Sequence, residues 1–358
     1  MLYQNSVLVN GWQWFWSENC NALYKRNLQT GETERVGAYA SCENAAYTKL
    51  VPYESKLIAL PYAADRIMIY DMGKMEFRYS DIGIPDINAK NVNSEKFYGY
   101  VVRENWLFMI GCKTAHVLKF DMAAEQAVEY VDLQGQLPKI NKGIGYLREG
   151  GLYGNQIFIP ALYENCVFVL DADSMRYSAK RFNKGGKGFS AICIIGSQIW
   201  LFPFDDEEII QWDCKNETVV KHNIKGLACL KKGSRNFLSA HLIGRKLWML
   251  PRFADKVLAY DFDAGKFSDE NEINSFFANS GKKLVGISAE RVEDGILFLT
   301  SESESVIVLN TEKDEISLVD NDISENDILN MIWRKEKKLM VSEKDFQLEN
   351  FLRFLCEL

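Results

Sequence analysis

Positively charged side chains gather in two neighbouring stretches of a chain whose formal net charge is -7. Residues 175–204 contain no Asp or Glu, and glycines at 185, 186 and 188 lie among the lysines there. Residues 225–235 form the second cluster. Local clusters attract anions whatever the net charge, and glycines let backbone N–H groups approach a ligand. The pattern therefore predicts an anion site, with solvated loop residues as the alternative. The candidate cations are Lys184, Lys187, Lys231, Lys232, Arg235 and Arg252.

Aromatic side chains accompany these cations. Aromatic faces beside positive charges suit an anionic sugar or a nucleotide, and packing in a core is the alternative for each residue. The candidates are Tyr62, Tyr98, Tyr100 and Phe204.

Signals for catalysis and for metals are weaker. The three histidines, His116, His222 and His241, are far apart in the sequence. The acidic run at 205–208 could hold a hard cation, but a charged turn also explains it. No P-loop, dinucleotide fingerprint or nucleophile elbow occurs. We therefore expect no catalytic residue, no metal and no cofactor, with an active site assembled from scattered loops as the alternative.

A repeat of roughly 42 to 50 residues must position these side chains. Each unit has an apolar run that ends in Asp or Asn before a polar turn; these positions are 27, 71, 121, 171, 213, 261 and 310. A second apolar run precedes each one, such as WQWFWS at 12–17 and LWMLP at 247–251. Short runs of this kind indicate buried strands. A weaker strand comes before them in every unit but the fourth, and an alternating one follows.

Four strands per unit at this period are typical of a propeller blade. We predict an all-β fold, a single β-propeller domain over 1–358 with about seven four-stranded blades. If the innermost strand of each blade runs from top to bottom, the junctions between blades and the loops between second and third strands share the top face. The two basic clusters are then neighbours there. The predicted blades span residues 5–36, 47–83, 97–133, 144–183, 189–225, 237–273 and 284–320.

The repeat resembles the kelch family, including the central propeller domain of galactose oxidase. In that family the third strand ends in Tyr-Asp before a short turn, as at Tyr70-Asp71 and Tyr260-Asp261 here. Kelch repeats end the second strand with Gly-Gly, whereas this chain has residues such as Pro61 or Gly111 there. The resemblance covers about residues 5–320 and implies the propeller architecture. The copper ligands and cross-linked tyrosine of galactose oxidase have no counterpart here.

The tail at 321–358 departs from the repeat. Residues 328–341 resemble another strand hairpin, and the apolar residues of 345–358 follow a largely helical spacing after Asp345. We predict a short C-terminal helix that packs on the ring, with a partner-binding helix as the alternative.

Composition narrows the setting. The amino terminus has no basic region followed by an apolar core, no run approaches 18 apolar residues, and the eight cysteines show no C-x-x-C spacing. These features predict a cytoplasmic protein with reduced thiols and no membrane partner. The pI of about 5.3 argues against nucleic acid as a partner. We also expect a monomer.

Two function classes remain open. The first is a non-catalytic kelch-like scaffold that binds a protein or an anionic ligand, such as a glycan or a phosphate-bearing molecule, on its top face. The second is a carbohydrate-active propeller enzyme, a lyase or hydrolase that uses Tyr, Lys and Arg at the channel mouth. Fold alone does not separate them.

Overall fold

The computed structural model describes most of the chain up to residue 320. The described residues are 3, 5–18, 20–38, 45–85, 87, 95–133, 135, 137, 146–224, 226–231, 233–269, 274–275, 285–292, 295–300, 305–310 and 315–320. The predicted C-terminal hairpin and helix lie outside them. So do two lysines of the second basic cluster, Lys225 and Lys232.

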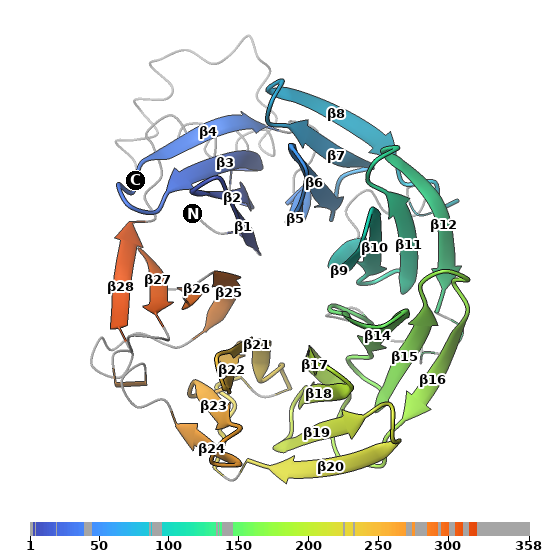
Figure 1. The fold of residues 1–358 in the computed structure, drawn as a ribbon, viewed down its shortest axis with the longest axis vertical. Helices are drawn as coiled ribbons and strands as arrows, with labels where there is room; N and C mark the ends of the chain where they lie inside the picture. The colour runs from blue at the N-terminus through green and yellow to red at the C-terminus, as the bar shows by residue number, and fades with distance from the viewer. Residues whose placement is uncertain are drawn as a thin grey trace, which may run out of the picture.

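Seven four-stranded antiparallel sheets form a closed ring, a seven-bladed β-propeller (Figure 1). The first four blades contain β1 (Ser6–Val9), β2 (Trp12–Ser17), β3 (Ala22–Asn27), β4 (Thr33–Ala38); β5 (Tyr47–Tyr53), β6 (Lys56–Pro61), β7 (Arg66–Asp71), β8 (Glu76–Asp81); β9 (Phe97–Arg103), β10 (Trp106–Gly111), β11 (His116–Asp121), β12 (Gln126–Asp132); β13 (Gly151–Tyr153), β14 (Gln156–Pro160), β15 (Cys166–Asp171), β16 (Tyr177–Arg181). The last three contain β17 (Phe189–Ile195), β18 (Gln198–Pro203), β19 (Glu208–Asp213), β20 (Thr218–Asn223); β21 (Phe237–Ile243), β22 (Lys246–Pro251), β23 (Leu258–Asp261), β24 (Lys266–Asp269); β25 (Gly286–Val292), β26 (Gly295–Thr300), β27 (Ser305–Asn310), β28 (Glu315–Asp320).

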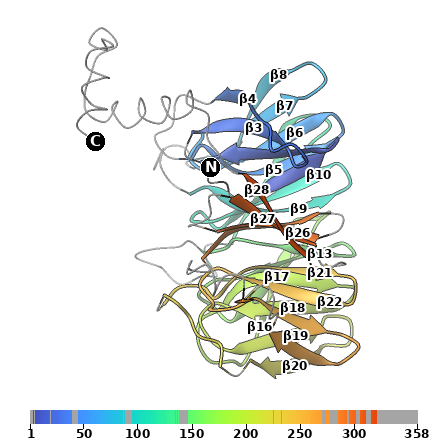
Figure 2. The ribbon, with the colours of Figure 1, turned by 90° about the vertical axis from the view of Figure 1, so that its left-hand side faces the viewer.

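Each blade consists of four consecutive strands, with the first innermost and the fourth outermost (Figures 1 and 2). The predicted seven blades are thus confirmed. The fourth blade also has an inner strand, β13, which is only three residues long. Its short length explains why no apolar run predicted it. The ring closes where β1 lies beside β25, and the backbone N–H of Ser6 donates to the Glu290 carboxylate across this seam.

The recurring Asp or Asn closes the turn between the third and fourth strands. The carboxylate of Asp121 accepts the backbone N–H groups of Ala123 and Ala124, both at 2.9 Å. Four residues after the Asp or Asn, the backbone adopts positive φ, at Glu125 as at Gly31. The side chain of the Asp or Asn accepts hydrogen bonds from the backbone of the turn, and this explains why the same turn recurs in the blades.

The hydrophobic core is divided into layers between adjacent blades. One layer, for example, packs Phe108 of β10 against Phe168 of β15, and another packs Trp200 of β18 against Met249 of β22. Seven such clusters are found among the described residues, one for each pair of neighbouring blades. The rigid blades therefore hold the loops at the two ends of the ring axis, which is lined by the inner strands and is called the channel below, in fixed positions.

Candidate functional site

Tyr98 and Arg148 form the first part of a site at one end of the channel. Tyr98 lies at the start of the inner strand β9, and its ring is buried. The guanidinium carbon of Arg148, in the loop before β13, lies 4.1 Å from the centre of that ring. Gly99 permits this approach, because a Cβ there would overlap the Arg148 carbonyl oxygen. A missing side chain on β9 thus positions an arginine from the next blade.

Arg235 comes from the junction between blades 5 and 6 and donates a hydrogen bond to the Tyr98 hydroxyl. Its loop is anchored by the next residue: Asn236 N–H donates to the Phe204 carbonyl at 2.7 Å, and Arg252 N–H donates to the Asn236 carbonyl at 2.8 Å. Only 4% of Arg235 is exposed, and its Nη1 is buried without a hydrogen-bond partner among the described residues. Burial of a cation with an unsatisfied donor is costly, so this residue requires an explanation.

Arg252 adds a third guanidinium directly after β22. It is half-buried, donates to the carbonyl of Gly286 at the start of β25, and lies 5.2 Å from the centre of the Phe253 ring. Gly286 again allows a close approach, because a Cβ there would overlap the Pro251 carbonyl. The three arginines therefore come from three separate loops of blades 4 to 6.

The three guanidinium groups interact electrostatically, but their surroundings differ. Against the effect of burial, Tyr98, Cys112, Tyr62 and Glu95 raise the pKa of Arg148. Burial, together with the nearby charges of Arg148 and Arg252, lowers the pKa of Arg235 to about 10. Burial, with a contribution from Arg148, also lowers the pKa of Arg252. Within the described part of the chain no carboxylate forms an ion pair with any of the three, although the charge of Glu95 acts on Arg148 and that of Glu18 acts on Arg252. All three remain charged at neutral pH, so the channel mouth carries concentrated positive charge.

Tyr62, Glu95 and Cys112 form the wall opposite. The Tyr62 hydroxyl donates to Glu95, and burial together with that carboxylate raises the pKa of Tyr62. The Cys112 thiol lies 3.5 Å from Glu95 Oε2, and burial raises its pKa to about 12. Both Tyr62 and Cys112 are thus held in their neutral, protonated forms.

Deeper in the channel, one lysine serves two carboxylates. Lys49 Nζ of β5 lies 2.9 Å from Glu149 Oε1, across the channel, and 5.9 Å from the centre of the Tyr100 ring. Glu290 of β25 faces the same pair. Burial raises the pKa of Glu290 to about 8, and the charge of Glu149 contributes to the rise. The channel below the arginines is therefore close to neutral or slightly negative, depending on Glu290.

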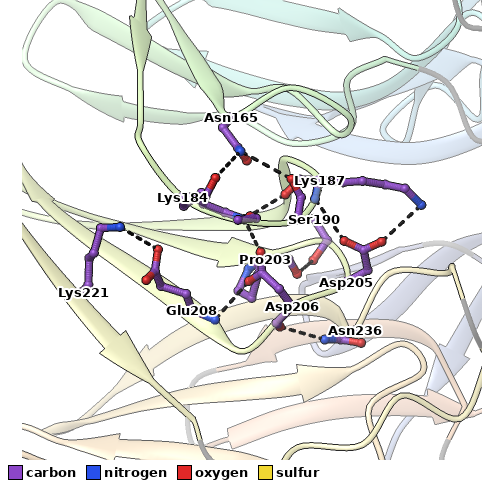
Figure 3. A network of polar contacts seen from close by, with 12 residues as sticks. Asn165, Lys184, Lys187, Ser190, Pro203, Asp205, Asp206, Glu208, Lys221 and Asn236 are labelled. Atoms are coloured by element: carbon purple, nitrogen blue, oxygen red, sulfur yellow. Dashed lines mark hydrogen bonds and ion pairs between the residues drawn. The ribbon is translucent and has the colours of Figure 1, made fainter.

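The first basic cluster has a different environment. Lys184 has a fully buried side chain that pairs with Asp206 and also donates to the carbonyls of Gly185 and Lys187 (Figure 3). Lys187 Nζ lies 3.2 Å from Asp205 Oδ2, and its backbone N–H donates to Asp205. The glycine-rich loop thus binds negative charge, but this charge comes from the acidic run of the chain itself at 205–208.

The remaining predicted residues divide between these regions. Phe204 is fully buried, with Lys187 Nζ 5.0 Å from its ring centre. Lys231 is exposed and lies 5.3 Å from the Phe253 ring centre, beside Arg252. The structure thus brings Tyr62, Tyr98, Arg235 and Arg252 together at the mouth and places Tyr100 below them.

Sequence reasoning missed Arg148, Glu95, Lys49 and Glu290. Arg148 lies in the junction before the weakest inner strand, where no repeat signal marked the start of a blade. Lys49 and Glu290 are single polar residues on inner strands. Their alternation with apolar neighbours was the available signal, since every second side chain of an inner strand faces the channel.

The histidines and acidic residues do not assemble into a metal site among the described residues. His241 faces Ser239 at 2.9 Å, and burial lowers its pKa to about 4. His222 donates to Gln211 at 2.8 Å and stacks on Trp200. The described residues also include no helix long and apolar enough to cross a membrane.

No protein-family model matches the chain, and no curated protein matches its sequence. Many solved structures share its fold. Virginiamycin B lyase from Staphylococcus aureus superposes with a TM-score of 0.62 at 12% identity, over 90% of this chain and 95% of that one. A computationally designed protein gives 0.58 at 8% identity (88% and 85%), and a chain of the mitotic checkpoint complex gives 0.56 at 10% (89% and 86%). At such identities the likeness shows the propeller architecture alone.

Proposed function

We propose that this propeller binds an anionic ligand at its channel mouth, through a carboxylate or phosphate group held by Arg148, Arg235 and Arg252. The observation that carries the proposal is the convergence of three guanidinium groups around Tyr98 with no described carboxylate paired to them. Such an arrangement is costly in the free protein and favourable once an anion arrives. The kelch-like scaffold role fits this site, with the blades as a rigid frame.

Guanidinium groups suit this task better than lysines, because their planar donors can bind a carboxylate or phosphate in bidentate fashion. Arg148 and Arg252 are half-buried at the mouth, whereas Arg235 lies beneath them. An anion that contacts the two outer groups would also be attracted by the charge of the inner one. Limited exposure to water strengthens each of these interactions.

The catalytic alternative has less support from the side chains present. Proton abstraction beside a uronate needs a base whose pKa lies near the working pH. Tyr62 has its pKa raised, and Cys112 has its pKa raised to about 12, so neither supplies a base or a nucleophile at neutral pH. Glu290, whose pKa is raised to about 8, meets the requirement but lies deeper in the channel, below the arginines. A binding role therefore fits the mouth itself better than proton transfer.

The test is a calorimetric titration with citrate, inorganic phosphate and glucuronate at low salt. Arg148→Met should weaken binding about ten- to hundredfold, because one charge-assisted hydrogen bond contributes about 1.5–3 kcal/mol. Binding by the parent should also weaken as salt rises, since part of the attraction is screened.

Arg245→Ala is the matched control. Arg245 is exposed, pairs with Asp263, and lies in the turn between β21 and β22 at the opposite end of its blade. The Arg245→Ala variant should bind all three anions with the affinity of the parent. Equal affinity of Arg148→Met and the parent would refute the proposed site.

A further inference from the structure

Among the described residues of this face, positive charge without an ion-pair partner extends from the mouth toward blade 6. Toward blade 5, Lys184 and Lys187 are paired with Asp206 and Asp205. Toward blades 2 and 3, Glu95 provides negative charge. Toward blade 6, Arg252 and Lys231 form no ion pair with a carboxylate of the described residues, although the charge of Glu18 acts on Arg252 and Asp255 accepts the Ala228 N–H at 3.1 Å. Of the three sectors compared, blade 6 is therefore the most favourable direction for a polyanion.

Two described cations, Arg235 and Lys231, lie on the loop between blades 5 and 6 in that direction. Arg235, nearest the channel, is only 4% exposed, whereas Lys231, farther out along the loop, is exposed. The Lys231 carbonyl accepts the Ser234 N–H at 3.1 Å, which fixes the turn between them. Leu230 N–H also donates to the Phe253 carbonyl at 2.6 Å, so the loop is attached to the segment that carries Arg252. Lys231 and Arg235 are thus held at a constant separation.

We propose that the ligand is an acidic oligosaccharide that lies across blade 6, with one carboxylate at the three arginines and a following carboxylate at Lys231. This inference rests on the proposed function and specifies its ligand. A uronate oligomer carries one carboxylate on each sugar ring, so its charges recur along the chain. Its rings are stiff, which lowers the entropy lost when a second unit is ordered at Lys231.

The half-exposed Phe253 supports a sugar over other polyanions. Its ring lies next to both Arg252 and Lys231, at 5.2 and 5.3 Å, so an apolar surface accompanies the charges. Nucleic acid is the less suitable polyanion, because the chain has a net charge of -7 and phosphate-backbone binding depends on broad basic surfaces. A ligand that alternates carboxylates with pyranose rings matches both features of blade 6.

The test compares galacturonate with its linear trimer by calorimetry, using the fully methyl-esterified trimer as the uncharged control. The parent should bind the trimer about two- to fivefold more tightly than the monomer, the gain expected for one exposed ion pair. Lys231→Ala should remove this gain and leave monomer binding unchanged. Lys215→Ala, an exposed lysine in the turn between β19 and β20 at the other end of blade 5, should keep it.

Each outcome has a distinct meaning. If the parent binds neither monomer nor trimer, the proposed function itself fails. If it binds both equally, or if Lys231→Ala keeps the gain, the site takes a single anion and the oligosaccharide inference is overturned. If a doubly phosphorylated peptide shows the Lys231-dependent gain and the trimer does not, the ligand is a phosphopeptide and the sugar assignment is wrong.

Discussion

Two regions of the same face are rich in positive side chains, and they differ in where the negative charge lies. At the junction of blades 4 and 5, Lys184, Lys187 and Lys221 have Asp206, Asp205 and Glu208 as partners. At the channel mouth, the three arginines have one another as neighbours. The first region satisfies its charge internally, whereas the second is suited to an external anion. A count of lysines and arginines does not distinguish them.

The channel below the mouth is a third arrangement, with an excess of acid. Lys49 lies near both Glu149 and Glu290. Its single positive charge balances one carboxylate, so ionisation of both would leave an excess negative charge. The positive charge of the junction is balanced within the chain, and that of the mouth is left for a ligand. In the channel, the excess charge is avoided because Glu290 stays protonated. The predictions below test these three outcomes in order of expected size.

The largest loss of stability is expected when a negative charge is removed from the junction of blades 4 and 5. Asp206→Ala leaves the fully buried Lys184 ammonium without its carboxylate. Breaking one partner of a buried pair costs several kcal/mol, so we expect a loss of about 3 kcal/mol in the free energy of unfolding. Denaturant titration followed by tryptophan fluorescence would measure it.

Asp263→Ala is the control for that experiment. Asp263 pairs with Arg245, and both side chains are more than 60% exposed. Exposed pairs contribute about 0–1 kcal/mol, so this variant should unfold close to the parent. Equal losses in the two variants would show that the junction pair is no more important than a surface pair.

The next effect is a pH dependence that comes from Glu290. Its pKa is raised from 4.5 to about 8, so the native state holds this proton more tightly than the unfolded state. Stability should therefore fall as pH rises from about 4.5 to about 8 and then level off. Glu290→Gln, which resembles the protonated acid, should lack this fall.

The measurement is best made between pH 6.5 and 9. His241, with its pKa lowered to about 4, acts in the opposite direction below pH 6.5, because the native state then resists protonation. Over the upper range the parent should lose about 1–2 kcal/mol relative to Glu290→Gln. Parallel stability curves would mean that Glu290 titrates normally.

The repeat made the fold predictable from the sequence. Strand pairs, buried apolar runs and the Asp or Asn turn are all local, and seven copies of one pattern exclude most other architectures. Only β13 was missed, because Gly151–Tyr153 is too short to show a periodic pattern. The topology also indicated which loops share a face, and so Arg235 and Arg252 were expected on the same side as Tyr62 and Tyr98.

The charge pattern of the site was harder to predict, because it depends on contacts between distant residues. Lys184 and Asp206 are 22 positions apart and meet across a hairpin loop. Arg148 reaches Tyr98 only because Gly99 leaves room for its backbone. Neither contact has a signature in composition or spacing. A stretch without acids in the sequence was therefore no guide to a surface without acids.

The smallest predicted effect has the opposite sign to the first. Arg235→Met removes a buried cation that lies beside two like charges and replaces it with an apolar side chain of similar length. The variant loses one hydrogen bond to Tyr98 but also an unsatisfied donor. We expect a gain of about 1 kcal/mol in the absence of ligand, as for residues kept for function at the expense of stability.

Citrate should reduce the stability difference between the two proteins or reverse it. It should raise the unfolding midpoint of the parent, which binds it when folded, and raise that of Arg235→Met by less, because the variant lacks the inner charge. Arg235→Lys, which keeps the charge, should be no more stable than the parent without citrate. If Arg235→Met instead loses about 2 kcal/mol or more in anion-free buffer, Arg235 stabilises the fold through Tyr98. The contrast between a balanced junction and an unbalanced mouth would then be wrong, because both regions would serve the fold alone.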